Sequence, residues 1–195
     1  MRRDFLPSVT AIVVLTVLFG VIYPLATTGV AQVLFPGKAD GSRIERNGKV
    51  VGSRLIGQDF RGRARYFQSR PSATGYSGNV TYFNNLGPNS KDLSDQFRKN
   101  LAAYLKRERP YNPGLGRADV PVDAVTTSAS GVDPHISQAN ARIQARRVAK
   151  VRGLGLDRVL ALVDDNTDGR ALGVLGEPGV HVLELNLALD REAPK

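Results

Sequence analysis

The segment from Thr126 to His135 carries the residue types that nucleophilic catalysis uses. It places hydroxyls, a carboxylate and an imidazole within ten residues of chain: Ser128, Ser130, Asp133 and His135. The nucleophile, base and orienting carboxylate of a hydrolase usually converge from separate segments, however. Neither serine stands in a Gly-x-Ser-x-Gly or Ser-x-x-Lys pattern. Hydroxyls and an aspartate before a helix are typical of turns and caps, so the pattern favours a structural role.

Other kinds of chemical site have little support in the sequence. The chain has no cysteine, which excludes disulfides, thiol catalysis and cysteine-bound metals. Its two histidines, His135 and His181, are too few for a multi-histidine zinc site, and no phosphate-binding Gly-x-x-x-x-Gly-Lys-Ser/Thr loop is present. We therefore expect no catalytic residue and no bound metal or cofactor, although four arginines could bind an anion: Arg61, Arg63, Arg65 and Arg70.

The amino-terminal segment contains no charged residue and no histidine between Asp4 and Lys38. A helix needs roughly 20 apolar residues to cross a bilayer. The sequence therefore predicts an anchor in residues 1–37, with about residues 6–28 spanning the membrane. Arg2 and Arg3 precede this segment, which favours a cytoplasmic amino terminus and an extracytoplasmic domain. A cleaved secretory signal, with small residues at 29–31 before the cut, is the alternative.

Small residues recur every four positions along this predicted helix. Thr16, Gly20 and Pro24 would share one face, and small side chains let membrane helices approach closely. The row is therefore a candidate contact for a partner helix. Glycine and threonine are also common in membrane helices without such a role.

The remaining residues, 38–195, predict a single mixed α+β domain. Asn47-Gly48 favours a tight hairpin between residues 42 and 53. Ser90 is a candidate cap for a helix that stops at Pro110, and Asp133-Pro134 is a candidate start for a helix that runs to residue 152. Three shorter elements complete the prediction: a strand at 122–126, a helix at 156–163, and a half-buried strand of alternating leucines at 183–190.

The chain has a formal net charge of +9 and a pI near 10.2. Its basic residues are scattered and its aromatic residues are few, so we expect no nucleic-acid partner. An exported basic domain more plausibly faces anionic headgroups or an acidic protein surface. Two alternatives therefore stay open: an anion- or headgroup-binding module, and a membrane-anchored envelope hydrolase that uses Ser128 or Ser130 with His135.

Several blocks, in order along nearly the whole chain, resemble one family: the C subunit of the bacterial Kdp potassium-transporting P-type ATPase. They include Gly-Ser-x-Leu-Ile-Gly-Gln-x-Phe, Asn-Leu-Gly-Pro-Asn-Ser and Asp-Pro-His-Ile-Ser, and they occupy residues 52–60, 66–73, 85–90, 121–137, 144–149, 175–178 and 182–190. The family usually has a Ser-Gly-Gly-Ser-like run before the Asn-Leu-Gly-Pro block. Here residues 77–84 are longer and more aromatic than that run.

The resemblance implies a non-catalytic accessory subunit of the inner (plasma) membrane. In this family ATP hydrolysis belongs to the P-type subunit and potassium selection to a channel-like subunit, so ATP and potassium are ligands of the complex. The family's C subunit is described as an assembly factor that raises the ATP affinity of the pump. An extracytoplasmic domain cannot touch cytoplasmic ATP, so a helix packed on the channel-like subunit, with the domain over its outer mouth, fits the residues better.

The matching blocks also supply candidate interaction residues. These are polar, aromatic or proline side chains inside the blocks, where the resemblance implies a contact with the other subunits: Gln58, Phe60, Arg70, Pro71, Ser72, Ser130, Asp133, His135, Glu177 and Asn186.

Overall fold

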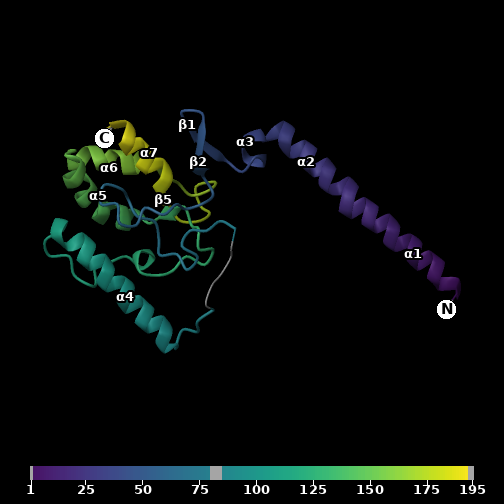
Figure 1. Ribbon diagram of the computed structural model, residues 1–195, viewed down its shortest axis with the longest axis horizontal. Coiled ribbons are helices and arrows are strands. Elements are labelled where there is room, and N and C mark those ends of the chain that lie inside the picture. The colour runs from purple at the N-terminus through teal and green to yellow at the C-terminus, as the bar shows by residue number, and fades with distance from the viewer. Residues whose placement is uncertain (1, 80–84, 193–195) are drawn as a thin grey trace. The chain divides into compact units, whose positions relative to one another are not determined.

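The computed structural model describes residues 2–79 and 85–192 (Figure 1). Contacts between residues divide the chain into two compact units, residues 1–51 and 52–195. The variant segment at 77–84 lies largely outside the described residues. Helices and strands together give a mixed α+β protein, which confirms the predicted class.

The first unit contains one long apolar helix. It consists of α1 (Arg2–Val17), a wider π-helical turn η1 (Leu18–Ile22) and α2 (Tyr23–Leu34), followed by the short α3 (Pro36–Ala39). The stretch Arg3–Leu34 has a mean hydropathy of 2.5 in its most apolar window, and within the described residues it is one candidate membrane span. A helix of 32 residues is about 48 Å long, which exceeds the hydrocarbon core of about 30 Å.

Pro24 accounts for the wide turn η1. Proline has no N–H, and its ring clashes with the carbonyl four residues earlier in a regular α-helix, here that of Gly20. The Tyr23 N–H instead donates to the carbonyl of Leu18, five residues back. Thr27 Oγ1 donates to the carbonyls of Tyr23 and Pro24 at 2.9 and 3.0 Å, so its hydroxyl is satisfied within the helix.

A β-hairpin follows this helix, as the sequence predicts. Strands β1 (Arg43–Arg46) and β2 (Lys49–Ser53) flank Asn47 and Gly48, whose φ angles are +52° and +72°. Both angles suit a two-residue type I′ turn.

The second unit has its core between three helices and a small sheet. Helices α5 (Gln138–Arg152), α6 (Leu156–Asp165) and α7 (Val182–Glu192) lie together (Figure 1). The antiparallel sheet has the order β3-β5-β4, from β3 (His135–Ile136), β5 (Gly179–His181) and β4 (Thr167–Asp168). Apolar side chains from the three helices, from β3 and β5 and from the segment around Phe67 fill the core, among them Phe67, Ile136, Ala145, Val159, Val180 and Leu185.

Helix α4 (Lys91–Glu108) begins and ends close to the predicted positions. Ser90 caps it by accepting from the Leu93 N–H, and the 3-10 turn η2 (Arg109–Tyr111) follows its last residue. The predicted helix at 156–163 is confirmed as α6, and Gly153 ends α5 with a φ of +69°.

Two predicted strands are wrong. Residues 122–126 form a short 3-10 turn, η3 (Val122–Ala124), and Val122 is 73% exposed. The alternating leucines at 183–190 belong to helix α7. Their alternation is compatible with a helix because Val182, Leu185, Asn186 and Leu189 recur every three or four residues, and all four are buried. Leucine, alanine and glutamate also favour helices intrinsically.

The predicted helix start at Asp133 is also wrong. Helix α5 begins at Gln138, where Ser137 Oγ accepts from the Asn140 N–H at 3.1 Å. Asp133 precedes β3, and its carboxylate accepts from the His135 N–H at 2.9 Å. Asp133 therefore fixes a turn before the strand, with the cap four residues further on.

Candidate functional site

Two buried amide side chains hold an extended segment against the helices. Asn186 of α7 accepts from the Phe67 N–H at 2.8 Å and donates to the Phe67 carbonyl at 3.0 Å. Gln144 of α5 does the same for Gln68, at 2.8 and 3.1 Å. Each amide therefore makes the pair of backbone hydrogen bonds that a neighbouring β-strand would otherwise make with this segment.

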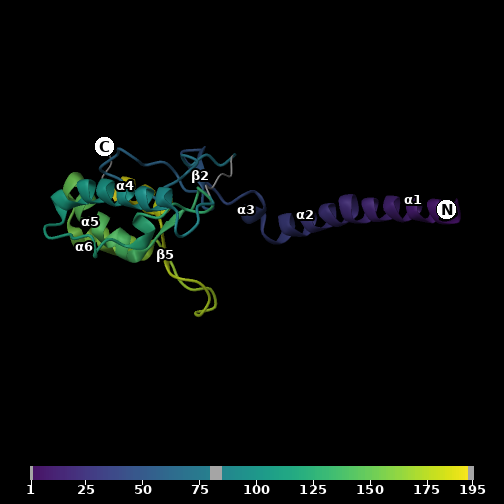
Figure 2. The same cartoon turned by 90° about the horizontal axis from the view of Figure 1, so that it is seen from below.

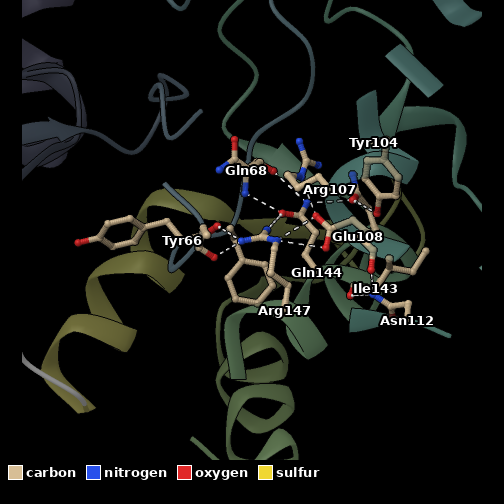
Figure 3. A network of polar contacts seen from close by, with 12 residues as sticks. Tyr66, Gln68, Tyr104, Arg107, Glu108, Asn112, Ile143, Gln144 and Arg147 are labelled. Atoms are coloured by element: carbon tan, nitrogen blue, oxygen red, sulfur yellow. Dashed lines mark hydrogen bonds and ion pairs between the residues drawn. The ribbon is translucent and has the colours of Figure 1, made fainter. Parts of the chain in front are cut away.

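Arg147 of α5 holds the same segment from one end (Figure 3). Its Nε donates to both carboxylate oxygens of Glu108 at 3.1 Å, and its Nη1 donates to the carbonyls of Tyr66, at 3.0 Å, and Ala64. Its Nη2 donates to Gln144 Oε1 at 3.0 Å. Burial lowers the pKa of the Arg147 guanidinium, and the charge of Glu108 opposes that shift.

The loop after this segment is joined to the loop before β3. Arg70 Nη1 lies 2.9 Å from a carboxylate oxygen of Asp133, and its Nη2 donates to Thr126 Oγ1 at 3.2 Å. Ser72 Oγ donates to the Gly131 carbonyl at 2.5 Å. The Arg70 and Asp133 side chains are about a quarter exposed. This junction brings together candidate residues from two separate blocks and uses their polar groups to hold the two loops.

Gly57 lets a third segment approach this junction. Its N–H donates to the Val132 carbonyl at 2.7 Å, and a Cβ at this position would lie 2.5 Å from the Asp133 carbonyl oxygen. The two candidates that follow Gly57 in the sequence, Gln58 and Phe60, also make hydrogen bonds within the domain. Gln58 donates to the Ile56 carbonyl at 3.2 Å, and the Phe60 carbonyl accepts from Gln68 Nε2 at 2.6 Å.

The structure places the two histidines side by side, which the sequence did not indicate. Their ring centroids are 5.2 Å apart in a T-shaped arrangement, because β3 and β5 pair His135 with His181. His135 Nε2 lies 3.0 Å from Asp168, which also pairs with Arg54 at 3.0 Å. Partial burial alone would raise the pKa of Asp168, but its hydrogen bond with His135 and the charge of Arg54 lower it.

Among the described residues, the hydroxyls near His135 have hydrogen-bond partners other than its ring. Ser130 Oγ lies 3.1 Å from Ser128 Oγ and accepts from the Val132 N–H at 3.2 Å. The His135 ring contacts Asp168 and Asp133 instead. Within the described ranges, no group of three histidine or acidic side chains is arranged to hold a metal ion.

A basic groove lies beside α4. It encloses about 800 Å³, and basic side chains stand around Leu101, Ala102, Leu105 and Pro110: Arg98, Lys106, Arg109 and Arg117. No acidic side chain is among these lining residues. Sequence reasoning missed this groove, although Arg98, Ala102 and Leu105 recur at helical spacing and a projection of α4 would have placed them on one face.

The remaining candidates are Glu177, the helix row of Thr16, Gly20 and Pro24, and Pro71, whose carbonyl accepts from the Ser128 N–H at 2.9 Å within the loop junction. Glu177 is highly exposed and pairs with Arg170 at 2.9 Å. Pro71 lines a cavity of about 230 Å³ together with Ser72 and Tyr76; burial raises the pKa of Tyr76 to about 12. Thr16, Gly20 and Pro24 lie on the exposed helix of the first unit, with the wide turn η1 between Thr16 and Pro24.

Comparison with known proteins agrees with the blocks found in the sequence. The family model described as KdpC, K+-transporting ATPase, c chain, matches residues 5–191. Potassium-transporting ATPase KdpC subunits from Rhodospirillum rubrum and Myxococcus xanthus are each 54% identical, over 100% and 98% of this chain and 98% and 89% of theirs. The subunit from Mycobacterium tuberculosis is 47% identical over 98% of this chain and 100% of its own. The chain therefore belongs to the KdpC family of potassium-transporting ATPase subunits.

Proposed function

We propose that this chain is a non-catalytic accessory subunit of a high-affinity, ATP-driven potassium uptake pump. It would assemble or stabilise the channel-like potassium-binding subunit and the ATP-hydrolysing subunit. One observation carries this proposal: the polar side chains of the family blocks bind the chain's own backbone and each other. Arg70 binds Asp133 and Thr126 through its two terminal nitrogens, Ser72 donates to the Gly131 carbonyl, and Asn186 bonds to the backbone of Phe67. Such internal bonding suits a rigid docking domain better than a substrate site.

The proposed arrangement places the long helix in the inner membrane as a single span. Its amino terminus lies in the cytoplasm and the α+β domain lies outside, as the arginines before the helix favour. ATP and potassium then bind to the partner subunits. Any increase in the ATP affinity of the pump acts through contact with those subunits, by stabilising their nucleotide-binding conformation.

Co-purification tests the assembly role. The tagged full-length chain is expressed with the other pump subunits, extracted in detergent and affinity-purified, and the recovered subunits are identified by mass. We expect both partners to be recovered, together with potassium-stimulated ATPase activity. The intact mass of the purified chain should include residues 2–30, as expected for a retained anchor. A mature chain that begins near Gln32 would instead indicate that the segment is a cleaved signal.

The hydrolase alternative is tested in the same preparation. The variants Ser130→Ala and His135→Ala remove the hydroxyl and the imidazole that such an enzyme would use. Unchanged potassium-stimulated ATPase activity in both variants is expected for an accessory subunit.

The basic groove beside α4 favours anion or headgroup binding as a second candidate function. Its arginine and lysine side chains suit a phosphate group, and its apolar residues suit the start of an acyl chain. Soluble short-chain phosphatidylglycerol should then raise the melting temperature of the full-length chain, and short-chain phosphatidylcholine should not. Added salt should weaken the effect, and Arg98→Gln with Arg117→Gln should remove it.

A further inference from the structure

The connection between β4 and β5 carries an apolar tip that nothing in its own domain covers. Figure 2 shows this yellow-green connection extending away from the helices of the second unit. Leu172 is 90% exposed, Val174 72% and Leu175 59%. Single exposed leucines are ordinary on protein surfaces, but three large apolar side chains at one projecting tip indicate an interaction site.

The tip, residues 170–177, is held in shape by its own hydrogen bonds. The backbones of Ala171 and Leu175 exchange two hydrogen bonds, each 2.9 Å long, and the Val174 N–H donates to the Ala171 carbonyl at 3.2 Å. The turn between them has Leu172 at φ +54° and Gly173 at φ +78°. The ion pair of Arg170 with Glu177 closes the base. The tip therefore presents its side chains without support from the core, which lowers the entropy cost of binding.

The conformation of Leu172 is costly for its residue type. A leucine with positive φ brings its Cβ close to the backbone, and glycine or asparagine normally occupies such a position. The side chain that bears this cost is also the most exposed of the large apolar residues in the described chain. Burial of the Leu172 side chain in a contact with another molecule would offset the cost of this backbone conformation.

We propose that the tip at residues 170–177 inserts into an apolar pocket on the extramembrane surface of another subunit of the potassium pump. The inference rests on the accessory role proposed above and names the element that makes the contact. The pocket would be concave and lined by apolar side chains that surround Leu172 and Val174. It would also offer hydrogen-bonding groups to the backbone of the turn.

The bilayer is a poor alternative occupant because of the backbone at the tip. Within the described part of the chain, the Leu172 N–H and the Val174 carbonyl have no hydrogen-bond partner. Such groups are costly in hydrocarbon, where irregular backbone is tolerated only against protein or water. The one cation of the tip, Arg170, is already paired with Glu177, so no free positive charge attracts anionic headgroups. A protein pocket can bury the apolar side chains of the tip and also supply hydrogen-bond partners for these two backbone groups.

A second copy of this chain also fits poorly. The groove beside α4, of about 800 Å³, is surrounded by arginine and lysine side chains. The apolar turn at residues 171–176 would remove water from those cations, and the carboxylate of the tip, Glu177, is already paired with Arg170. A contact with a different, apolar surface avoids that cost.

The test replaces the tip leucine without disturbing the turn. Asparagine tolerates positive φ, so Leu172→Asn should keep the shape of the tip and remove its apolar contact. The tagged full-length variant is expressed with the other subunits, and recovery of the complex is measured in detergent. We expect recovery to fall about tenfold, as for truncation of a buried interface anchor, while the melting temperature of the chain is unchanged or slightly higher.

Val122→Asn is the matched control, because Val122 is 73% exposed on η3, away from the tip in sequence. It should leave recovery of the complex unchanged. A photo-crosslinking amino acid at position 172 should link to a pump subunit.

Three outcomes would overturn the inference: wild-type recovery for Leu172→Asn, an equal loss for Val122→Asn, or crosslinks from position 172 to lipid or to a second copy only. These outcomes leave the accessory role intact as long as the wild-type chain recovers both partners. If the wild-type chain itself recovers neither partner, the proposed function fails as well.

Discussion

Arg147 and Glu108 form an ion pair that is almost completely enclosed, with side chains 1% and 0% exposed. The guanidinium also bonds to the backbone carbonyls of Ala64 and Tyr66 and to the amide of Gln144. A buried pair is costly to form, but removing one partner strands the other in a dry environment. This pair therefore ties α4, α5 and the extended segment into one cooperative unit.

Arg147→Ala should destabilise the domain by on the order of 3 kcal/mol, because two carbonyls lose their donor and the buried Glu108 keeps only its pair with Arg107. Urea unfolding of the full-length chain in detergent, followed by tyrosine fluorescence, measures the change. Arg158→Ala is the control, since Arg158 pairs with Glu192 on the surface and should matter little. Equal stability of the two variants would contradict the structural role of the buried pair.

The Arg147 pair also shows why sequence patterns did not predict the interior. The basic run at residues 142–152 has the composition of a solvated face, yet Arg147 and Arg152 have almost fully buried side chains. Their partners are backbone carbonyls and carboxylates far away in the sequence, such as Glu108 and Asp190. Long-range pairing of this kind leaves no periodic signal along the chain.

Local chemistry, by contrast, predicted several elements correctly. Asn47-Gly48 gave the hairpin and Ser90 the start of α4, because a positive φ and a cap depend on one or two residues. The leucines at 183–190 failed because the same letters suit a strand of period two and a helix of period three to four. The three-dimensional structure distinguishes the helix from the strand, because the buried residues of α7 follow the helical spacing and include the polar Asn186.

The loop junction gives a second prediction, on the Arg70–Asp133 pair. Asp133→Ala should cost on the order of 1 kcal/mol, because it removes an ion pair and the acceptor for the His135 N–H. Asp133→Asn should cost less, since the amide oxygen still accepts from that N–H. A double-mutant cycle with Arg70→Ala measures the coupling. Additive losses would mean that the two side chains do not stabilise one another.

Asp168 predicts a dependence of stability on pH. Its pKa in the folded domain is lowered from the ordinary value of 3.8. A lowered carboxyl pKa adds stability that is fully present above the unfolded pKa and is lost as the pH falls through the folded pKa. The unfolding free energy of wild-type chain should therefore exceed that of Asp168→Asn at pH 6, with a difference that shrinks below about pH 4. Asp168 is half exposed, so the effect should be small and salt-sensitive.

The difference in unfolding free energy between wild-type chain and Asp168→Asn should also depend on the neighbours of Asp168. His135 donates to the carboxylate, and Arg54 pairs with it. Arg54→Gln should reduce the difference between wild-type chain and Asp168→Asn at pH 6. A difference that persists unchanged from pH 6 to pH 3 would contradict the assigned cause.

The last prediction concerns the helix row of Thr16, Gly20 and Pro24. A Cβ at Gly20 would meet nothing closer than Thr16 Cγ2, at 3.8 Å, which is an ordinary contact within the helix. Gly20→Leu is therefore compatible with the helix itself, and any loss of complex must come from a partner that approaches this face. We expect recovery of the detergent-extracted complex to fall about fivefold, equivalent to about 1 kcal/mol. Gly20→Ala should give a smaller loss, and Leu15→Ala, on a neighbouring exposed position, should give almost none. Equal recovery of all three variants would reject this face as the partner contact, because a helix that packs closely at Gly20 cannot accommodate a leucine side chain between the two backbones.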